Sequence, residues 1–227
     1  MREIKKIVVI GPESTGKSTL CEQLADHYNT IWCPEYAREY LSRNGASYTY
    51  EDLLEIAKGQ VRLEDEYVEK VAGISWPVVG GRGVRSQEIA DRSNPIAEDV
   101  FESGIWKLES GNFKPETSNP KPFFIDTNMY VMKVWCEFVY EKCHQYILDE
   151  IVDRKYDMYL LCNIDLPWTK DELREYPDYE SRAKLYHIYK DILINQQVPW
   201  AGISGANEER KLKAIEAIDT LLFTSYD

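Results

Sequence analysis

Short apolar runs alternate along the chain with longer segments whose apolar residues recur every three to four positions. The short runs predict β-strands, and the longer segments predict amphipathic helices. The predicted strands cover residues 4–10, 30–33, 122–126, 157–162 and 198–203. The predicted helices cover residues 17–28, 49–72, 128–151, 181–195 and 207–222. Because strands and helices alternate, the pattern predicts an α/β domain with a parallel sheet covered by helices on both faces.

Polar residues and prolines refine the limits of several elements. Thr49 and Asp52 have the spacing of a capping box at the start of the second predicted helix. Asn207 precedes the last predicted helix. The buried stripe predicted for that helix consists of positions 212, 215, 218 and 222. Pro199 lies in the last predicted strand, and since proline cannot donate to a central ladder, that strand is expected at a sheet edge.

One region, residues 74–121, interrupts the alternation. It holds 9 of the chain's 22 Gly and Pro residues in 48 positions, which predicts a loop-rich insertion with one ordered piece in IAEDVFESGIWKLES. The cluster Gly80-Gly-Arg-Gly83 within it is interpreted as a flexible loop, with a second phosphate-binding nest as the alternative.

Length and charge limit the class of protein. A chain of 227 residues fits one domain, predicted to span residues 1–227. The net charge of −12 has the wrong sign for a protein that tracks a nucleic-acid backbone, so nucleic acid is excluded as a partner. An anionic ligand must then be met by a local cluster of donors. The sequence leaves the oligomeric state open, a homo-oligomer included.

Cysteine usage and hydropathy indicate a cytoplasmic protein without a membrane partner. The 5 cysteines stand singly with no C-x-x-C pair, which predicts reduced, packed thiols and argues against cysteine metal ligands. No apolar run approaches the ~18–20 residues of a membrane span. The basic N-terminus leads into an apolar run too short for a signal peptide.

The strongest chemical signal follows the first predicted strand. The stretch GPESTGKS matches G-x-x-x-x-G-K-[ST], in which glycines let backbone N–H groups surround a phosphate chain at a helix N-terminus. Lys17 is expected to reach the β- and γ-phosphates, and the Ser18 hydroxyl to bind Mg²⁺. No N-K-x-D guanine-reading motif is present, which favours ATP. The loop residues assigned to nucleotide binding are Gly11, Glu13, Ser14, Thr15, Gly16, Lys17, Ser18 and Thr19.

An acidic residue ends the third predicted strand. Asp126 follows Phe-Phe-Ile, where a phosphate-loop fold places an Asp beside the loop hydroxyl to support Mg²⁺. The alternative is an Asp that only caps the next helix. We favour the metal role.

Glu35 and Arg38 lie just past the second predicted strand, at the strand end where ligands bind in parallel sheets. Three positions apart, they would share a face of a helical turn. They form either a surface ion pair or an acceptor site, in which Glu35 takes a proton from an acceptor hydroxyl and Arg38 steers phosphate. The sequence does not decide between Glu35 and Asp126 as the general base.

Two further segments carry candidate ligand contacts. Residues 165–182 include Arg174 and Arg182 and occupy the position of a kinase lid, with ordinary solvated charges as the alternative. The lid role is favoured more for Arg174 than for Arg182. Ser204, after the last predicted strand, either contacts adenine or belongs to a helix cap.

The order of GPESTGKST, PEYAREYL, FFIDTN and DELREYP resembles the ribosylnicotinamide kinase domain of the NadR family, within the P-loop NTPase superfamily. The resemblance covers residues 4–73 and 122–223. It implies a five-stranded parallel sheet of order 2-3-1-4-5 and transfer of the ATP γ-phosphoryl to the 5′-hydroxyl of nicotinamide riboside. The absence of H-x-G-H indicates the kinase activity alone.

Site residues follow from this resemblance by position. Lys17, Glu35, Asp126 and Arg174 would be catalytic, with Mg²⁺ on Ser18 and Asp126 and ATP on the loop, Arg174 and Ser204. The acceptor would be bound by Glu35, Tyr36, Arg38, Asp126 and Trp135. Trp135 or Tyr36 would supply an aromatic wall, unless both rings are core residues. The alternatives are a kinase of another nucleoside-like acceptor and a non-enzymatic nucleotide-binding regulator.

Overall fold

The computed structural model describes residues 3–73 and 120–223. Five parallel strands form one sheet in the order β2-β3-β1-β4-β5, which confirms the predicted order. The strands are β1 (Ile4–Ile10), β2 (Trp32–Cys33), β3 (Lys121–Asp126), β4 (Met158–Cys162) and β5 (Trp200–Ile203). The helices are α1 (Lys17–His27), α2 (Tyr36–Asn44), α3 (Tyr50–Gly73), α4 (Met129–Tyr140), α5 (Gln145–Asp153), α6 (Tyr179–Asn195) and α7 (Glu208–Phe223).

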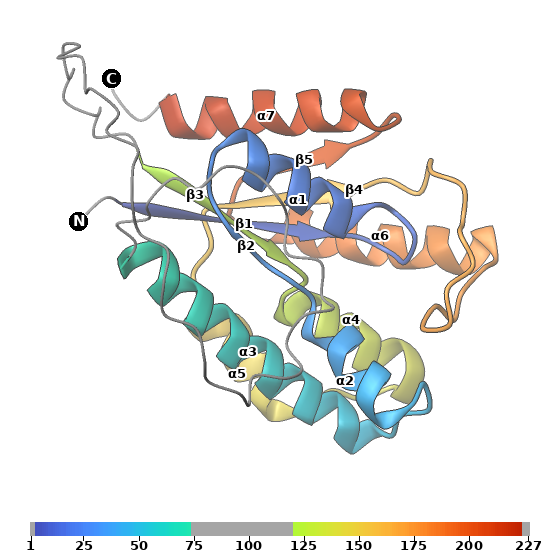
Figure 1. The fold of residues 1–227 in the computed structure, drawn as a ribbon. Helices are drawn as coiled ribbons and strands as arrows, with labels where there is room; N and C mark the ends of the chain where they lie inside the picture. Colours follow the sequence, from blue (N-terminus) through green and yellow to red (C-terminus); the bar gives the residue numbers. More distant parts are fainter. Residues whose placement is uncertain (1–2, 74–119, 224–227) are drawn as a thin grey trace, which may run out of the picture. The chain divides into compact units, whose positions relative to one another are not determined.

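Helices cover both faces of the sheet (Figure 1). Successive side chains of a strand point to opposite faces, so Ile7 and Val9 of β1 pack under α1 and α7. Val8 and Ile10 face the other way, toward α4 and α6. A further apolar cluster joins α2, α3, α4 and α5 on that second side. The central strand β1 is therefore buried on both faces, as its continuous apolar run predicts.

Several predicted boundaries are confirmed by hydrogen bonds. Thr49 and Asp52 bond reciprocally at the start of α3, with Thr49 N–H donating to Asp52 at 2.7 Å and Asp52 N–H donating to Thr49 Oγ1 at 3.3 Å. β5 lies at a sheet edge, and Pro199 contributes its carbonyl to Tyr159 N–H at 3.0 Å. All 5 cysteines are free thiols, as expected, and only Cys143 is not fully buried.

Four expectations about helices are wrong. The segment predicted as one helix over 128–151 is two, because Glu141 adopts a left-handed conformation (φ 56°) that ends α4. α2 is an additional helix, and α6 begins two residues earlier than predicted. In α7, Leu212 is 57% exposed, and the inward face instead carries Arg210.

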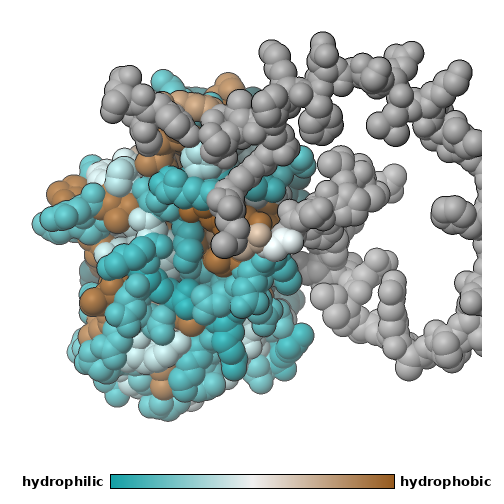
Figure 2. Space-filling model, turned by 90° about the vertical axis from the view of Figure 1, so that its left-hand side faces the viewer, coloured by the Kyte–Doolittle hydropathy of each residue, from teal (hydrophilic) through white to brown (hydrophobic). Residues whose placement is uncertain are grey.

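The insertion predicted over residues 74–121, including Gly80–Gly83, lies outside the described residues except for its last two positions. Residue 121 is the first of β3. In the part of the chain that the structure describes, no helix has the length and hydropathy needed to cross a membrane. The face shown in Figure 2 is mainly hydrophilic, with its apolar side chains in small separate groups.

Candidate active site

The loop between β1 and α1 has the geometry of a phosphate-binding loop. Gly11 (φ 146°) approaches β4 so closely that a Cβ would lie 2.7 Å from the Cys162 carbonyl oxygen, and Gly16 (φ 76°) caps α1 in the left-handed region. Lys17 folds back and donates to the Pro12 carbonyl at 3.1 Å. The loop thus presents an ammonium group and a helix N-terminus to the same space.

Ser18 and Asp126 lie together, as predicted. The Ser18 hydroxyl donates to Asp126 Oδ2 at 2.5 Å. Asp126 is 1% exposed, and burial, together with the charge of Glu35, raises the pKa of this carboxyl to about 6. Asn128 rather than Asp126 caps α4, accepting from Tyr130 N–H at 3.1 Å. A hydroxyl beside a desolvated carboxylate is an oxygen donor pair that fits Mg²⁺.

Glu35 stands at the N-cap position of α2, but its side chain makes no capping hydrogen bond and lines the pocket. The hydroxyl of Thr127 lies 3.5 Å from Glu35 Oε1 and 3.4 Å from Asp126 Oδ1. Thr127 has φ 76°, a conformation that β-branched residues rarely adopt. One strained residue therefore lies between the two candidate carboxylates.

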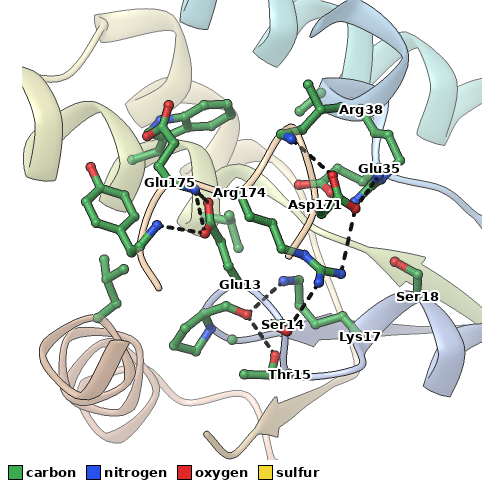
Figure 3. A pocket seen from close by; sticks show the side chains of 18 of the residues that line it. Glu13, Ser14, Thr15, Lys17, Ser18, Glu35, Arg38, Asp171, Arg174 and Glu175 are labelled. Atoms are coloured by element: carbon green, nitrogen blue, oxygen red, sulfur yellow. Dashed lines mark hydrogen bonds and ion pairs between the residues drawn. The ribbon is translucent and has the colours of Figure 1, made fainter. Parts of the chain in front are cut away.

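The β4–α6 loop (residues 163–178) folds over the phosphate loop (Figure 3). Arg174 donates to Ser14 Oγ at 3.2 Å and to the Thr169 carbonyl at 2.6 Å. Glu13 accepts from the backbone N–H groups of Glu175, at 2.9 Å, and Tyr176, at 3.1 Å. Burial raises the pKa of Glu13, although these two backbone donors oppose the shift.

Arg38 and Arg182 contact the same β4–α6 loop from two different helices. Arg38 of α2 forms a 3.0 Å ion pair with Asp171, whose pKa is lowered mainly by the backbone N–H of Leu173 and further by Arg38. Arg182 belongs to α6, is 4% exposed, and donates to the Leu166 carbonyl at 3.3 Å. Burial lowers its pKa. Arg182 is therefore no ordinary solvated charge.

One pocket of about 400 Å³ brings the phosphate loop and the acceptor candidates together. Its polar side is the phosphate loop, with Arg174 and Glu175 above it (Figure 3). Its other side is largely apolar and aromatic. The side chains of that second side include Leu41, Val131, Trp135, Phe138, Leu173, Tyr176, Leu185 and Tyr189.

Tyr36 and Ser204 do not line this pocket. The ring of Tyr36 packs over Gly59 of α3, where a Cβ would overlap it, so it does not line the pocket and Trp135 does. Ser204 accepts from Lys213 at 3.0 Å and is likewise outside the pocket lining. The assignments of Tyr36 to the acceptor and Ser204 to the nucleotide therefore stay predictions. Tyr36 is half-buried against α3, and Ser204 belongs to the β5–α7 connection.

Two buried polar residues that sequence reasoning missed hold the site in place. Gln60 of α3 is 1% exposed, accepts from Tyr36 N–H at 2.7 Å and donates to the Pro34 carbonyl at 3.4 Å. It thereby fixes the backbone on both sides of Glu35. Arg210 of α7 donates to the Thr15 carbonyl at 2.9 Å, which supports the phosphate loop from beneath.

Comparison with known proteins gives the family. A family model described as an AAA domain matches residues 6–79 and 80–210. The chain belongs to this AAA-domain family. Membership agrees with the phosphate loop, the sheet order and the position of Asp126 at the end of β3.

The AAA-domain chain is also similar to proteins named trifunctional NAD biosynthesis/regulator protein NadR, which confirms the expected resemblance. It is 21% identical to the Salmonella typhimurium LT2 protein and 20% identical to the Escherichia coli K12 protein, each over 227 residues. These alignments cover 96% of this chain and 43% of each relative. The chain thus spans less than half the length of these curated relatives.

Solved structures support the same fold. A NadR protein in complex with NR superposes with a TM-score of 0.58 at 18% identity, covering 98% of this AAA-domain chain and 52% of that chain. A NadR protein in complex with NAD and AMP-PNP gives 0.57 at 18% identity, covering 98% and 51%. At this identity the comparison establishes the fold and no more.

Proposed function

We propose that this chain is an ATP-dependent kinase that phosphorylates the 5′-hydroxyl of nicotinamide riboside to give nicotinamide mononucleotide. The observation that carries the proposal is the single pocket in which the phosphate loop faces Glu35 and an aromatic wall. A protein that only binds nucleotide needs the first half of this pocket, whereas a kinase needs both halves. The resemblance to NadR supports the choice of acceptor.

The phosphate half would bind and polarise ATP. Lys17 and the N-terminus of α1 would hold the β- and γ-phosphates, and Arg174 would neutralise charge that develops on the transferring group. Ser18 and Asp126 would hold Mg²⁺, which supplies further charge neutralisation when bound. Since Arg174 already contacts Ser14 of the loop, a small displacement of its guanidinium would place it on phosphate.

The acceptor half would orient the attacking hydroxyl. The Glu35 carboxylate would accept the proton of the 5′-hydroxyl while that oxygen forms a bond to the γ-phosphorus. The bond between the γ-phosphorus and the β,γ-bridging oxygen breaks, and ADP leaves. Thr127 and Gln60 keep Glu35 in place from its two sides. The ion pair between Arg38 and Asp171 would close the pocket and limit access of water.

Charge and aromaticity favour a cationic acceptor such as a pyridinium nucleoside. The carboxylates that line the pocket are Glu13, Glu35, Asp171 and Glu175, and the cations are Lys17, Arg38 and Arg174. Phosphate would engage Lys17 and Arg174, and Arg38 pairs with Asp171, which leaves the Glu35 carboxylate as uncompensated negative charge on the acceptor side. An indole such as Trp135 attracts a cationic ring through its π face.

A phosphorylation assay with ATP, Mg²⁺ and nicotinamide riboside tests the proposal by detection of nicotinamide mononucleotide. We expect turnover in the parent protein, and a loss of at least about 100-fold in Lys17→Ala. Lys58→Ala is the matched control, because Lys58 lies on the surface of α3 in an ion pair with Glu55. Product formation no higher than in Lys17→Ala would overturn the acceptor assignment.

The same assay separates the two alternatives. Neutral nucleosides added as competitors identify a kinase of another acceptor, which would phosphorylate them in preference to the pyridinium nucleoside. A non-enzymatic regulator would bind ATP and leave its γ-phosphate intact after long incubation with every acceptor.

A further inference from the structure

Tyr48 lies in the connection between α2 and α3. It links Trp135, on the aromatic side of the pocket, to Glu175 of the β4–α6 loop. Its hydroxyl accepts from Trp135 Nε1 at 2.7 Å and donates to Glu175 Oε2 at 2.8 Å. Its ring packs edge-on against Trp135, with the ring centroids 4.9 Å apart. Tyr140 of α4 fixes the Tyr48 backbone by donating to its carbonyl at 2.9 Å.

The direction of these hydrogen bonds is determined by chemistry. An indole N–H can only donate and a carboxylate can only accept, so the single phenolic proton of Tyr48 must go to Glu175. Burial raises the pKa of Tyr48 and keeps that proton in place at neutral pH, and the bond to Glu175 acts in the same direction. No other arrangement of donors and acceptors satisfies all three groups.

Glu175 connects this chain of bonds to the phosphate loop. Its side chain accepts from Tyr48, while its backbone N–H donates to the Glu13 carboxylate at 2.9 Å. Figure 3 shows Glu13 rising from the phosphate loop to meet the backbone at Glu175. A continuous path of polar contacts therefore runs from the phosphate loop through Glu13, Glu175 and Tyr48 to Trp135.

We propose that Tyr48 is a positioning residue that couples the nucleotide subsite to the acceptor subsite through Glu175. Nucleotide bound to the phosphate loop keeps the β4–α6 loop in contact with it. Glu175 then keeps its hydrogen bond to Tyr48. Tyr48, in turn, fixes the orientation of the Trp135 indole. The consequence for the acceptor rests on the proposed function, whereas the response of Trp135 to nucleotide does not.

Because Glu175 is exposed, its hydrogen bond with Tyr48 can form and break without unfolding the domain. Glu175 is exposed, whereas the Tyr48 ring is partly buried in a cluster with Trp135 and Tyr140. An exposed hydrogen bond contributes little to folding, so its loss leaves the domain intact. Energetic coupling between two ligand sites requires such an element with two states.

The test uses the full chain labelled with 5-fluorotryptophan and observed by ¹⁹F NMR. The chain has 6 tryptophans, and the Trp135 signal is identified by its loss in Trp135→Phe. A non-hydrolysable ATP analogue with Mg²⁺ is titrated without any acceptor. We expect the Trp135 signal to move on binding, and Tyr48→Phe to remove at least about half of that movement while the nucleotide Kd stays within about twofold.

Side-chain variants of Glu175 keep the test decisive if Tyr48→Phe fails to fold. Glu175→Ala should reproduce the Tyr48→Phe result, and Glu175→Gln should retain the parent response because its amide oxygen still accepts from Tyr48. Tyr50→Phe is the matched control, since the Tyr50 ring stacks on His144 in the same cluster.

One outcome of the ¹⁹F experiment contradicts the proposed coupling. An unchanged nucleotide-dependent movement of the Trp135 signal in Tyr48→Phe and Glu175→Ala would overturn the coupling. For an acceptor that the protein phosphorylates, Tyr48→Phe should also raise the KM of that acceptor about fivefold with little effect on kcat. Failure to phosphorylate nicotinamide riboside would count against the proposed function alone, because the ¹⁹F experiment contains no acceptor.

Discussion

The hydroxyl of Ser18 and the carboxylate of Asp126 meet at 2.5 Å although 108 positions separate them in the chain. β1 and β3 are neighbours in the sheet, with Val9 in register with Asp126, so the ends of these strands bring the two groups together. The carboxylate is buried, and Ser18 and Thr127 are its hydrogen-bond partners among the described residues. The site therefore holds a charge that destabilises the fold.

Asp126→Asn should stabilise the protein and inactivate it. The pKa of Asp126 is raised from 3.8 to about 6, so the folded state holds this proton more tightly than the unfolded state does. The stability that this group contributes is full below about pH 4 and is lost as the pH rises through about 6. The amide is always neutral, so we expect a higher Tm than the parent above pH 6 and an equal Tm near pH 4, measured by calorimetry.

Activity should show the opposite change in this variant. Without the carboxylate, kcat with ATP and Mg²⁺ should fall at least about 100-fold. Asp191→Asn, at an exposed position of α6, is the control and should alter neither property. A parent Tm higher than that of Asp126→Asn at pH 8 would show that the buried charge is well compensated.

Thr127→Val should lower kcat about tenfold, whereas Thr127→Ser should stay within about threefold of the parent. Valine preserves the shape of threonine but removes the hydroxyl that lies between Glu35 and Asp126. Serine keeps the hydroxyl and lacks the β-branch that is strained at φ 76°. Steady-state kinetics with both variants checks this. Equal kcat values in the two would assign Thr127 a backbone role only.

Gln60→Met should impair the acceptor side of the site selectively. The methionine side chain fills a similar volume but leaves the Tyr36 N–H without its 2.7 Å acceptor, at a cost of about 1–3 kcal/mol. We expect kcat to fall about tenfold as Glu35 loses its fixed position, with an unchanged Kd for ATP by calorimetry. Gln145→Met, at an exposed position of α5, is the control. A weakened ATP affinity would mean that the substitution disturbs the whole sheet edge.

Arg210→Lys should weaken nucleotide binding and lower Tm together. The guanidinium donates to the carbonyls of Gly205, Thr15 and Asn163 at 2.7, 2.9 and 2.8 Å and pairs with Asp165. A lysine ammonium cannot reach this planar set of acceptors. We expect a loss of about 2 kcal/mol, or about 4–8 °C in Tm for a domain of this size, and a Kd for ATP raised about tenfold.

Thermal unfolding and calorimetric titration check the Arg210 prediction, with Arg43→Lys on the surface of α2 as the control. A lower Tm with unchanged nucleotide affinity would show that Arg210 supports the fold without shaping the phosphate loop.

The features that the sequence predicts correctly depend on patterns among neighbouring residues. The phosphate loop, the capping box at Thr49 and the alternation of strands and helices each depend on neighbouring positions, and the sheet order followed from the family resemblance. The sequence predicts the position of Asp126 at the sheet edge because this residue ends an apolar strand. It predicts the position of Glu35 there because Glu35 follows such a strand, and the roles of both residues stay predictions.

The residues that the sequence does not reveal have hydrogen-bond partners far away in the chain. Gln60 lies 24 positions from Tyr36, and nothing around it distinguishes it from other polar helical residues. Leu212 was expected inside α7 on hydropathy, but Arg210 occupies the inward face because four acceptors satisfy its guanidinium there. Hydropathy cannot anticipate a buried charge whose partners come from other elements.

The bond from Arg210 to Thr15 spans 195 positions of the chain. During synthesis the phosphate loop leaves the ribosome long before Arg210, by about 10 to 40 s at usual rates of elongation. Throughout that interval the nascent chain lacks the guanidinium that holds Thr15. If Arg210→Lys weakens nucleotide binding as predicted, the phosphate loop reaches its full affinity only after α7 has packed against the sheet, which is late in synthesis.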